Sequence, residues 1–190
     1  GIIYRQFADN KAAYIVTPDK EHLKDVVFAS IGIDFGGNKS LTTFVATAIH
    51  GDFSKLTVIA DHHIKGRKGD IDADRLCREF VGFVQRFRTE YPWIQIRYCW
   101  ADSEAQYLIN SLRKAVRENA LGFTVEDCKK KRILDRIVAA STLLNTKRMF
   151  VAKNCELVQG GLENALWDAK HPDQRLDNFS TDIDILDAFE

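Results

Sequence analysis

The sequence has little proline, with 3 residues in 190, and no excess of either charge, since 27 basic residues balance 27 acidic ones. Low proline with a hydrophobic fraction of 45% excludes disordered and collagen-like chains. No apolar run approaches the roughly 18–20 residues of a membrane-spanning helix. Because no signal-peptide n- and h-regions open the sequence, we expect no secretory leader. The charge balance excludes binding of nucleic acid by bulk positive charge. We therefore expect one globular α/β domain with no membrane partner.

The four cysteines, Cys77, Cys99, Cys128 and Cys155, form no CxxC or CxxH pair. A zinc knuckle is therefore disfavoured. Cys77 and Cys99 fall at apolar positions of an expected helix and strand, where cysteine acts as a small hydrophobic residue. We expect reduced cysteines and an intracellular protein.

Hydrophobic periodicity divides the rest of the chain into strands and helices. Residues 1–25 are polar and irregular, so we expect a lead-in or linker remnant there and one domain over 26–190. Three strands joined by short turns, typical of an antiparallel meander, are expected over 26–34, 42–49 and 56–64. Helices are then expected over 72–88, 105–116, 133–144, 157–166 and 183–189, with intervening strands over 94–100, 122–125 and 149–152. This order predicts an α/β fold with a mixed sheet and helices on both faces.

An aspartate, Asp34, ends the first apolar strand and is followed by Phe35, Gly36 and Gly37. Ligands bind at the carboxyl ends of strands in open α/β sheets, and glycine lets a ligand approach the backbone closely. The alternative is a turn aspartate that accepts hydrogen bonds from local amides. Residues 32–40 nearly spell a phosphate-binding loop, but one extra residue separates the second glycine from the lysine, which argues against it.

A second aspartate, Asp102, follows the strand expected over 94–100, directly before a helix. It is either a helix N-cap or a second acid of a site. If the two strands run parallel, both carboxylates lie at the same edge of the sheet.

Three further acids, Asp182, Asp184 and Asp187, lie in the last expected helix. Asp184 and Asp187 share a helix face, where like charges destabilise each other without a cation. A solvated acidic helix start is the alternative. Acids gathered from distant parts of a chain build the oxygen-only sites that bind Mg²⁺ or Mn²⁺.

Together, the stretch Gly32-Ile33-Asp34-Phe35-Gly36-Gly37, the strand ending in Ala101-Asp102 and the final Asp-Ile-Asp-Ile-Leu-Asp-Ala-Phe resemble a known family. It is the ribonuclease H-like nuclease domain of tailed-bacteriophage terminase large subunits, and the match covers roughly residues 26–190. The resemblance implies that Asp34, Asp102 and Asp184 bind two Mg²⁺ or Mn²⁺ ions. Asp182 is the alternative for the third acid, and Asp182 and Asp187 are possible additional metal ligands. It implies an endonuclease that cuts concatemers of double-stranded viral DNA with low sequence specificity.

The resemblance also implies partners that this chain does not contain. Terminase large subunits carry a packaging ATPase domain in the same polypeptide, so the chain is expected to be an excised nuclease domain. A small terminase subunit and the portal are further implied partners, in the cytoplasm of the host cell. In this scheme Asp34 bridges two ions, while Asp102 and Asp184 each bind one of them.

Two basic clusters are candidates for contacts with the DNA backbone, which an acidic site would repel. The alternative is a solvated charged surface. The clusters comprise Lys65, Arg67 and Lys68, and Lys129, Lys130, Lys131 and Arg132. His62 and His63 are expected to be a structural pair at a strand end, and His171 to lie near the site only in sequence. The tryptophans Trp93, Trp100 and Trp167 are expected to pack in or around the core rather than to stack on bases.

Three other functions remain open at this level. One is a nucleotide-binding fragment of the actin/Hsp70 type, whose first phosphate loop resembles residues 32–37, although such ATPases need a duplicated domain. Another is a junction resolvase or integrase-like nuclease, which shares the logic of the three acids. The last is a non-catalytic DNA-binding assembly module.

Overall fold

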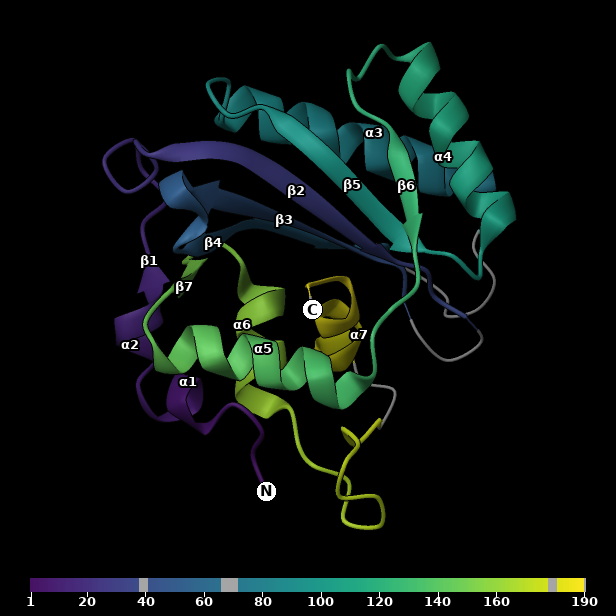
Figure 1. Ribbon diagram of the computed structural model, residues 1–190. Helices are drawn as coiled ribbons and strands as arrows, with labels where there is room; N and C mark the ends of the chain where they lie inside the picture. The colour runs from purple at the N-terminus through teal and green to yellow at the C-terminus, as the bar shows by residue number, and fades with distance from the viewer. Residues whose placement is uncertain (38–40, 66–71, 178–180, 190) are drawn as a thin grey trace.

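The computed structural model describes residues 1–37, 41–65, 72–177 and 181–189, with side chains from residue 184 onward in the last range. These residues form one seven-stranded sheet with helices on both faces (Figure 1). The strands are β1 (Ile15–Val16), β2 (Val26–Asp34), β3 (Thr43–His50), β4 (Leu56–His63), β5 (Ile96–Asp102), β6 (Val125–Cys128) and β7 (Met149–Ala152).

The order of the strands across the sheet is β1-β7-β4-β3-β2-β5-β6. Strands β2, β3 and β4 pair antiparallel, which confirms the expected meander. The outer strands add in parallel, β5 to β2, β6 to β5, β7 to β4 and β1 to β7. The expected mixed sheet is therefore confirmed, and β2 and β5 end at the same edge.

The helices follow in the predicted alternation with the later strands. They are α1 (Arg5–Asp9), α2 (Lys11–Tyr14), α3 (Ala73–Glu90), α4 (Gln106–Glu118), α5 (Ile133–Asn145), α6 (Glu156–Asn164) and α7 (Thr181–Phe189), with a short 3₁₀ turn at Gly51–Phe53. None of the helices in the described ranges is both long and apolar enough to cross a membrane.

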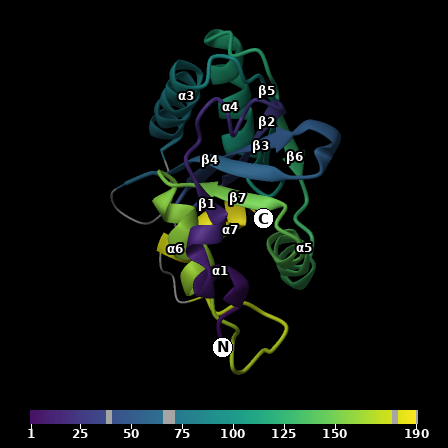
Figure 2. The same cartoon turned by 90° about the vertical axis from the view of Figure 1, so that its left-hand side faces the viewer.

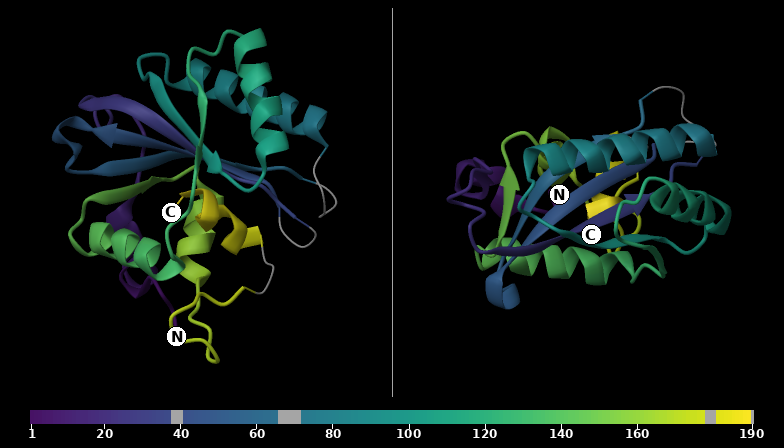
Figure 3. Two further views of the ribbon diagram at one scale, coloured as in Figure 1. Left: turned by 45° about the vertical axis from the view of Figure 1, so that its right-hand side comes forward. Right: turned by 90° about the horizontal axis from the view of Figure 1, so that it is seen from above.

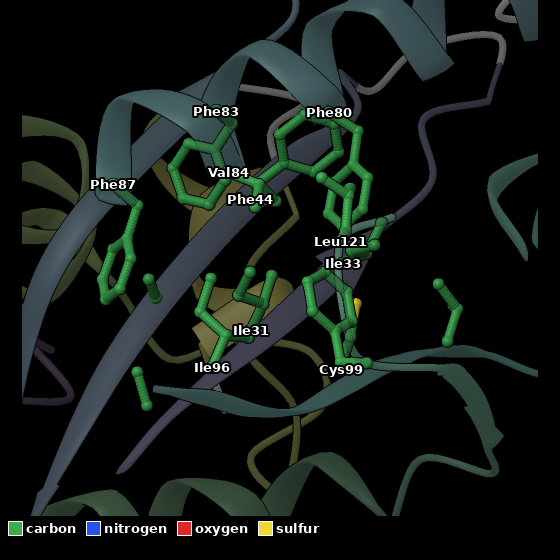
Figure 4. Packing of buried hydrophobic residues seen from close by; sticks show 14 of the residues in the cluster. Ile31, Ile33, Phe44, Phe80, Phe83, Val84, Phe87, Ile96, Cys99 and Leu121 are labelled. Carbon is green, nitrogen blue, oxygen red and sulfur yellow. The ribbon is translucent and has the colours of Figure 1, made fainter. Parts of the chain in front are cut away.

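Two hydrophobic clusters lie on opposite faces of the sheet. Helices α3 and α4 cover one face, and α5, α6, α7 and the N-terminal helices cover the other (Figures 2 and 3). In the first cluster, Phe80, Phe83 and Phe87 of α3 pack on Ile31 of β2 and Ile96 of β5 (Figure 4). This apolar stripe, at helical spacing, is what holds α3 against the sheet.

The N-terminal segment differs from expectation. Residues 1–25 contain α1, α2 and β1 instead of an irregular lead-in, and β1 pairs with β7. Tyr4, Phe7 and Tyr14 are at most 2% exposed and join the second cluster. Elements of two to five residues are too short to repeat an apolar stripe, so periodicity could not reveal them.

One other boundary shifts for a local reason. The strand expected over 122–125 is β6, which begins only at Val125. Gly122 has a φ of +78°, which lies in the left-handed region and does not occur in a regular strand. Leu121 and Phe123 are still buried, so the apolar pattern there marks a connection anchored in the core.

Asp61 joins β4 to the first turn of α6. The amide of Val158 donates to its Oδ2 at 2.9 Å, and Leu157 contributes a second backbone hydrogen bond. Burial raises the pKa of this carboxyl to about 6 from its ordinary 3.8, and the two amides oppose the rise.

The raised pKa of Asp61 predicts a pH-dependent stability. Because the folded chain holds the proton more tightly than the unfolded chain does, stability falls as pH rises from about 4 to about 6. Asp61→Asn, which is uncharged and still accepts from Val158, is expected to reduce that slope in urea unfolding measured across this range. The exposed control Asp9→Asn is expected to keep the wild-type slope. An unchanged slope in Asp61→Asn contradicts the assignment.

Candidate active site

The two strand-end aspartates lie side by side, as the parallel pairing requires. Ile33 of β2 is in register with Ala101 of β5, so Asp34 and Asp102 follow at the same edge of the sheet. Asp102 is not the N-cap of α4, since that position is Ala105. Its Oδ1 accepts from the amide of Glu104 at 3.1 Å.

A lysine lies between these two carboxylates. The Nζ of Lys130 pairs with Oδ1 of Asp34 and lies 3.8 Å from Oδ2 of Asp102. Lys130 lies in the connection between β6 and α5. This connection begins where β6, the neighbour of β5 in the sheet, ends. Asp34 and Asp102 therefore already hold one positive charge between them.

Burial dominates the electrostatics of Asp34. It raises the pKa of this carboxyl to about 6, while the positive charge of Lys130 acts in the opposite direction. The charges of Asp187 and Asp102 raise it further. Asp102 of β5 and Asp187 of α7 therefore both lie close enough to Asp34 to raise its pKa.

Asp187 is the acid of α7 that belongs to this group. Its Oδ1 accepts from Nη1 of Arg136 at 3.1 Å and from Nη2 of Arg175 at 2.8 Å. Arg136 lies on α5 and Arg175 in the loop before α7. Asp187 lines one cavity together with Asp102 and Lys130.

Asp184 is hydrogen-bonded to the start of β3, where Thr43 is in register with Asp34. The Asp184 side chain is 5% exposed, and its Oδ2 accepts from the amide of Leu41 at 2.9 Å. The hydroxyl of Thr43 donates to its carbonyl oxygen at 3.2 Å. The geometry thus ties Asp184 to the start of β3 and brings Asp187 toward Asp34.

A glycine allows α7 to reach this position. A Cβ added at Gly32 of β2 would overlap the carbonyl oxygen of Ala188 on α7. Only glycine permits this distance between the helix backbone and the strand. The contact lies directly beside Asp187 in the chain and two residues before Asp34.

Asp102 and Asp187 line a cavity of about 410 Å³ on the face of the sheet that α7 covers. Ser30, Gly32 and Thr47 belong to its lining from the sheet. Trp100 lines it from β5, and Lys129, Lys131 and Arg136 line it from the β6–α5 connection and α5. The cavity therefore combines an acidic end with a basic wall.

The remaining candidates are spread over the surface. Lys65 is exposed, and its carbonyl accepts from Arg75, while Arg67, Lys68 and the Asp182 side chain lie outside the described residues. Arg132 is exposed and pairs with Asp135. His62 bonds Glu79 and stacks on Phe44, in keeping with a structural role. His171 pairs with the neighbouring Asp168.

Sequence reasoning missed the roles of four contributors to the site. Arg136 and Arg175 orient Asp187, but an isolated arginine carries no signal of its partner. Lys130 was expected on DNA rather than between the two aspartates. Gly32 did carry a signal, because an isolated glycine inside a strand indicates close approach of another backbone.

Neither the family models nor the curated protein sequences give a match to the chain. Solved structures do. The whole chain is similar to the large terminase of a thermophilic bacteriophage, with a TM-score of 0.71 and 17% identity, and it spans 44% of that protein. It also matches the nuclease domain of the P22 large terminase, with a TM-score of 0.68 and 15% identity over 100% of this chain and 89% of the other.

A third neighbour is the nuclease domain of the large terminase g2p of bacteriophage SPP1, solved with bound Mn. Its TM-score is 0.59 at 18% identity, with 92% of this chain and 93% of that one covered. The chain has the fold of large-terminase nuclease domains. The ribonuclease H-like architecture expected from the resemblance is thereby confirmed.

The contact at Gly32 predicts a large effect of one methyl group. Gly32→Ala is expected to push α7 off β2 and to destabilise the protein by about 1–3 kcal/mol, the usual cost of overpacking. Gly82→Ala in α3 is the matched control, since its Cβ would meet only the flexible end of Arg86, at 3.2 Å. That control is expected to be neutral or stabilising by up to about 1 kcal/mol. Equal unfolding midpoints in urea for the two variants would rule out the close contact.

Proposed function

We propose that the chain is a metal-dependent endonuclease that hydrolyses phosphodiester bonds of double-stranded DNA. The observation that carries the proposal is the convergence of Asp34, Asp102 and Asp187, from β2, β5 and α7, next to a cavity that Asp102 and Asp187 line together with basic residues. The fold shared with terminase nuclease domains, one of them solved with Mn, supports the same activity.

The donor set suits hard divalent cations. Carboxylate oxygens are the ligands that Mg²⁺ and Mn²⁺ prefer, and no thiol or imidazole is needed among them. Asp34 and Asp102 already accommodate one positive charge, the ammonium of Lys130, where a metal ion would bind. Within the described residues no three His, Cys, Asp or Glu side chains are close enough to hold an ion. Lys130 must therefore swing aside, and Asp187 must shift from its arginines, when ions bind.

The assignment of the third acid changes with the geometry. The resemblance suggested Asp184 or Asp182 as the third acid, and Asp187 only as a possible additional metal ligand. We assign Asp187, because Asp184 is occupied by the amide of Leu41 while Asp187 faces Asp34. Two bound ions would activate the attacking water and neutralise the leaving oxygen.

Each residue of the chain then has a defined task. Asp34, the most central, would bridge two ions. Asp102 is held by the Glu104 amide through Oδ1, so its Oδ2 is directed at the shared centre. Arg136 and Arg175 keep Asp187 oriented and balance its charge while no ion is bound.

Basic residues beside the site would hold the DNA. Lys129 and Lys131 are exposed at the cavity wall, and Arg132 follows them. The cluster of Lys65, Arg67 and Lys68 is a second candidate. Contacts of lysine with phosphate position a duplex without reading its sequence, so low sequence specificity is expected.

The wider context also belongs to this proposal. The large terminase of the thermophilic bacteriophage is more than twice as long as this chain, which leaves room for the packaging ATPase domain expected in the same polypeptide. Concatemer cutting during genome packaging, with a small subunit and the portal as partners in the host cytoplasm, follows from that likeness.

Replacing single acids tests the assignment. Asp34→Asn and Asp187→Asn are expected to lose Mn²⁺-dependent nicking of supercoiled plasmid by about a thousandfold, since a metal site supplies several kcal/mol to the transition state. Asp184→Asn still accepts from Leu41 and is expected to stay within a few-fold of wild type. Circular dichroism would confirm that each variant folds.

The exposed Asp9→Asn serves as the matched control. Full activity of Asp34→Asn, or of the wild type in EDTA, would refute a metal-dependent nuclease. Loss of activity in Asp184→Asn but not in Asp187→Asn would return the third position to Asp184.

Neutralising the basic wall tests the DNA contacts. Lys129→Gln combined with Lys131→Gln is expected to weaken duplex binding in EDTA and to reduce the slope of log K against log salt by about 1.8, from two lost phosphate contacts. Lys24→Gln with Lys114→Gln, both exposed and paired with glutamates elsewhere, is the control. An identical slope in both double variants would assign Lys129 and Lys131 to a merely solvated surface.

A further inference from the structure

The face of β5 beside the acids carries exposed aromatic rings. Tyr98 and Trp100 stack with centroids 5.8 Å apart and planes inclined by 24°. They are 41% and 40% exposed, although Trp100 was expected to pack in or around the core. Phe28 of β2 is only 6% exposed and packs edge-on against Tyr98 at 5.4 Å, so it supports that ring from within. We call Tyr98 and Trp100 the aromatic ladder.

The ladder stays exposed because of how β5 is covered. Ile96, Cys99 and Ala101 of β5 point into the cluster under α3 and α4. On the other face, α7 packs on β2 and β3, while α5 packs on β7. The rings of Tyr98 and Trp100, on the neighbouring strand β5, therefore remain exposed beside these helices.

The aromatic ladder lies next to the proposed catalytic acids. Tyr98 is in register with Ser30 and Trp100 with Gly32, so their side chains share the face on which α7 docks. Ser30, Gly32 and Trp100 all line the cavity that ends at Asp102 and Asp187. With about 410 Å³, it has the size of a small-ligand pocket rather than of a duplex.

The charged and aromatic residues around the cavity indicate which class of ligand it binds. Trp100 of the ladder lines the cavity together with Lys129 and Lys131. Arg97, the neighbour of Tyr98 in β5, places its guanidinium over Phe28, 4.5 Å from the ring centre. Exposed rings close to several cations match a chain that carries both bases and phosphates.

We infer that the aromatic ladder binds the unpaired bases of a single DNA strand next to the cleavage site. In a duplex each base face is covered by its neighbours, so the rings can stack only on bases that have left the helix. The inference rests on the proposed nuclease function and extends it: the lysines hold the duplex, and the cut strand is locally unpaired as it passes the acids.

Binding of oligo(dT) and of a matched duplex tests this inference, by fluorescence anisotropy in EDTA at fixed salt. The Tyr98→Ala/Trp100→Ala double variant is expected to bind oligo(dT) about tenfold more weakly or worse, the effect of losing at least one base stack. Its affinity for the duplex is expected to stay within about twofold. Trp100→Phe, which keeps a ring, is expected to retain most of the affinity for the single strand.

Trp93→Ala is the matched control, because Trp93 is 44% exposed and packs against Tyr91, away from the acids. Wild-type affinity for oligo(dT) in the Tyr98→Ala/Trp100→Ala variant overturns the inference. An equal loss for oligo(dT) and duplex also overturns it, since the rings would then support the cavity without contacting bases.

A measurement on the unaltered chain keeps the test valid if the double variant does not fold. Oligonucleotides carrying 5-bromouracil are expected to photocross-link to Tyr98 or Trp100. Adducts confined to other residues, or a self-association of the chain that buries these rings, would overturn the inference.

The two proposals can fail separately. Asp34→Asn, tested without metal, is expected to bind oligo(dT) with the same dependence on Trp100. Absence of plasmid nicking with intact ladder binding would refute the nuclease alone. Nicking by the wild type with no effect of the ladder variants on oligo(dT) would refute the ladder alone.

Discussion

Helix α7 touches β2 at Gly32, where the strand has no side chain and the Ala188 carbonyl fills the space. The same docking buries Ile185 and Leu186 in the second hydrophobic cluster. It turns Asp187 toward Asp34 and Asp184 toward the amide of Leu41. Burial of apolar surface thus provides the driving force for an acidic helix to lie beside another acid, a placement that charge alone would oppose.

The cost of gathering carboxylates is offset by cations from nearby connections. Lys130 reaches Asp34 and Asp102 from the segment after β6, and Arg136 and Arg175 reach Asp187 from α5 and the loop before α7. Partly buried charges are tolerated only when paired in this way. The even count of acids and bases in the whole sequence is therefore matched locally, where Lys130, Arg136 and Arg175 accompany Asp34, Asp102 and Asp187.

Long elements with a strong apolar period were predictable. The stripe of Leu76, Phe80, Phe83 and Phe87 gave α3, and two strands ending in aspartate gave the shared edge of Asp34 and Asp102. The short N-terminal elements carried too few residues for a period. The choice between Asp184 and Asp187 was also beyond the sequence, because residues three apart share a helix face and only the docking at Gly32 separates their directions.

Lys130 illustrates a further limit of the sequence. Four consecutive basic residues at 129–132 look alike in the chain, and their different surroundings arise only in three dimensions. Lys130 pairs with Asp34 at the acidic edge of the sheet, whereas Lys129 and Lys131 line the cavity wall. Arg132 pairs with Asp135 in solvent. Composition therefore identified the cluster but not the division of roles within it.

The dependence on α7 has a consequence for the order in which the molecule is made. Asp34 and Asp102 belong to strands synthesised early, whereas Asp187 and the helix that covers Gly32 come from the far end of the described chain. Domains emerge from the ribosome N-terminus first, and contacts between distant segments form late. A nascent chain that has completed the sheet still lacks one acid and the wall that positions it. The three carboxylates can therefore meet only after synthesis has passed α7.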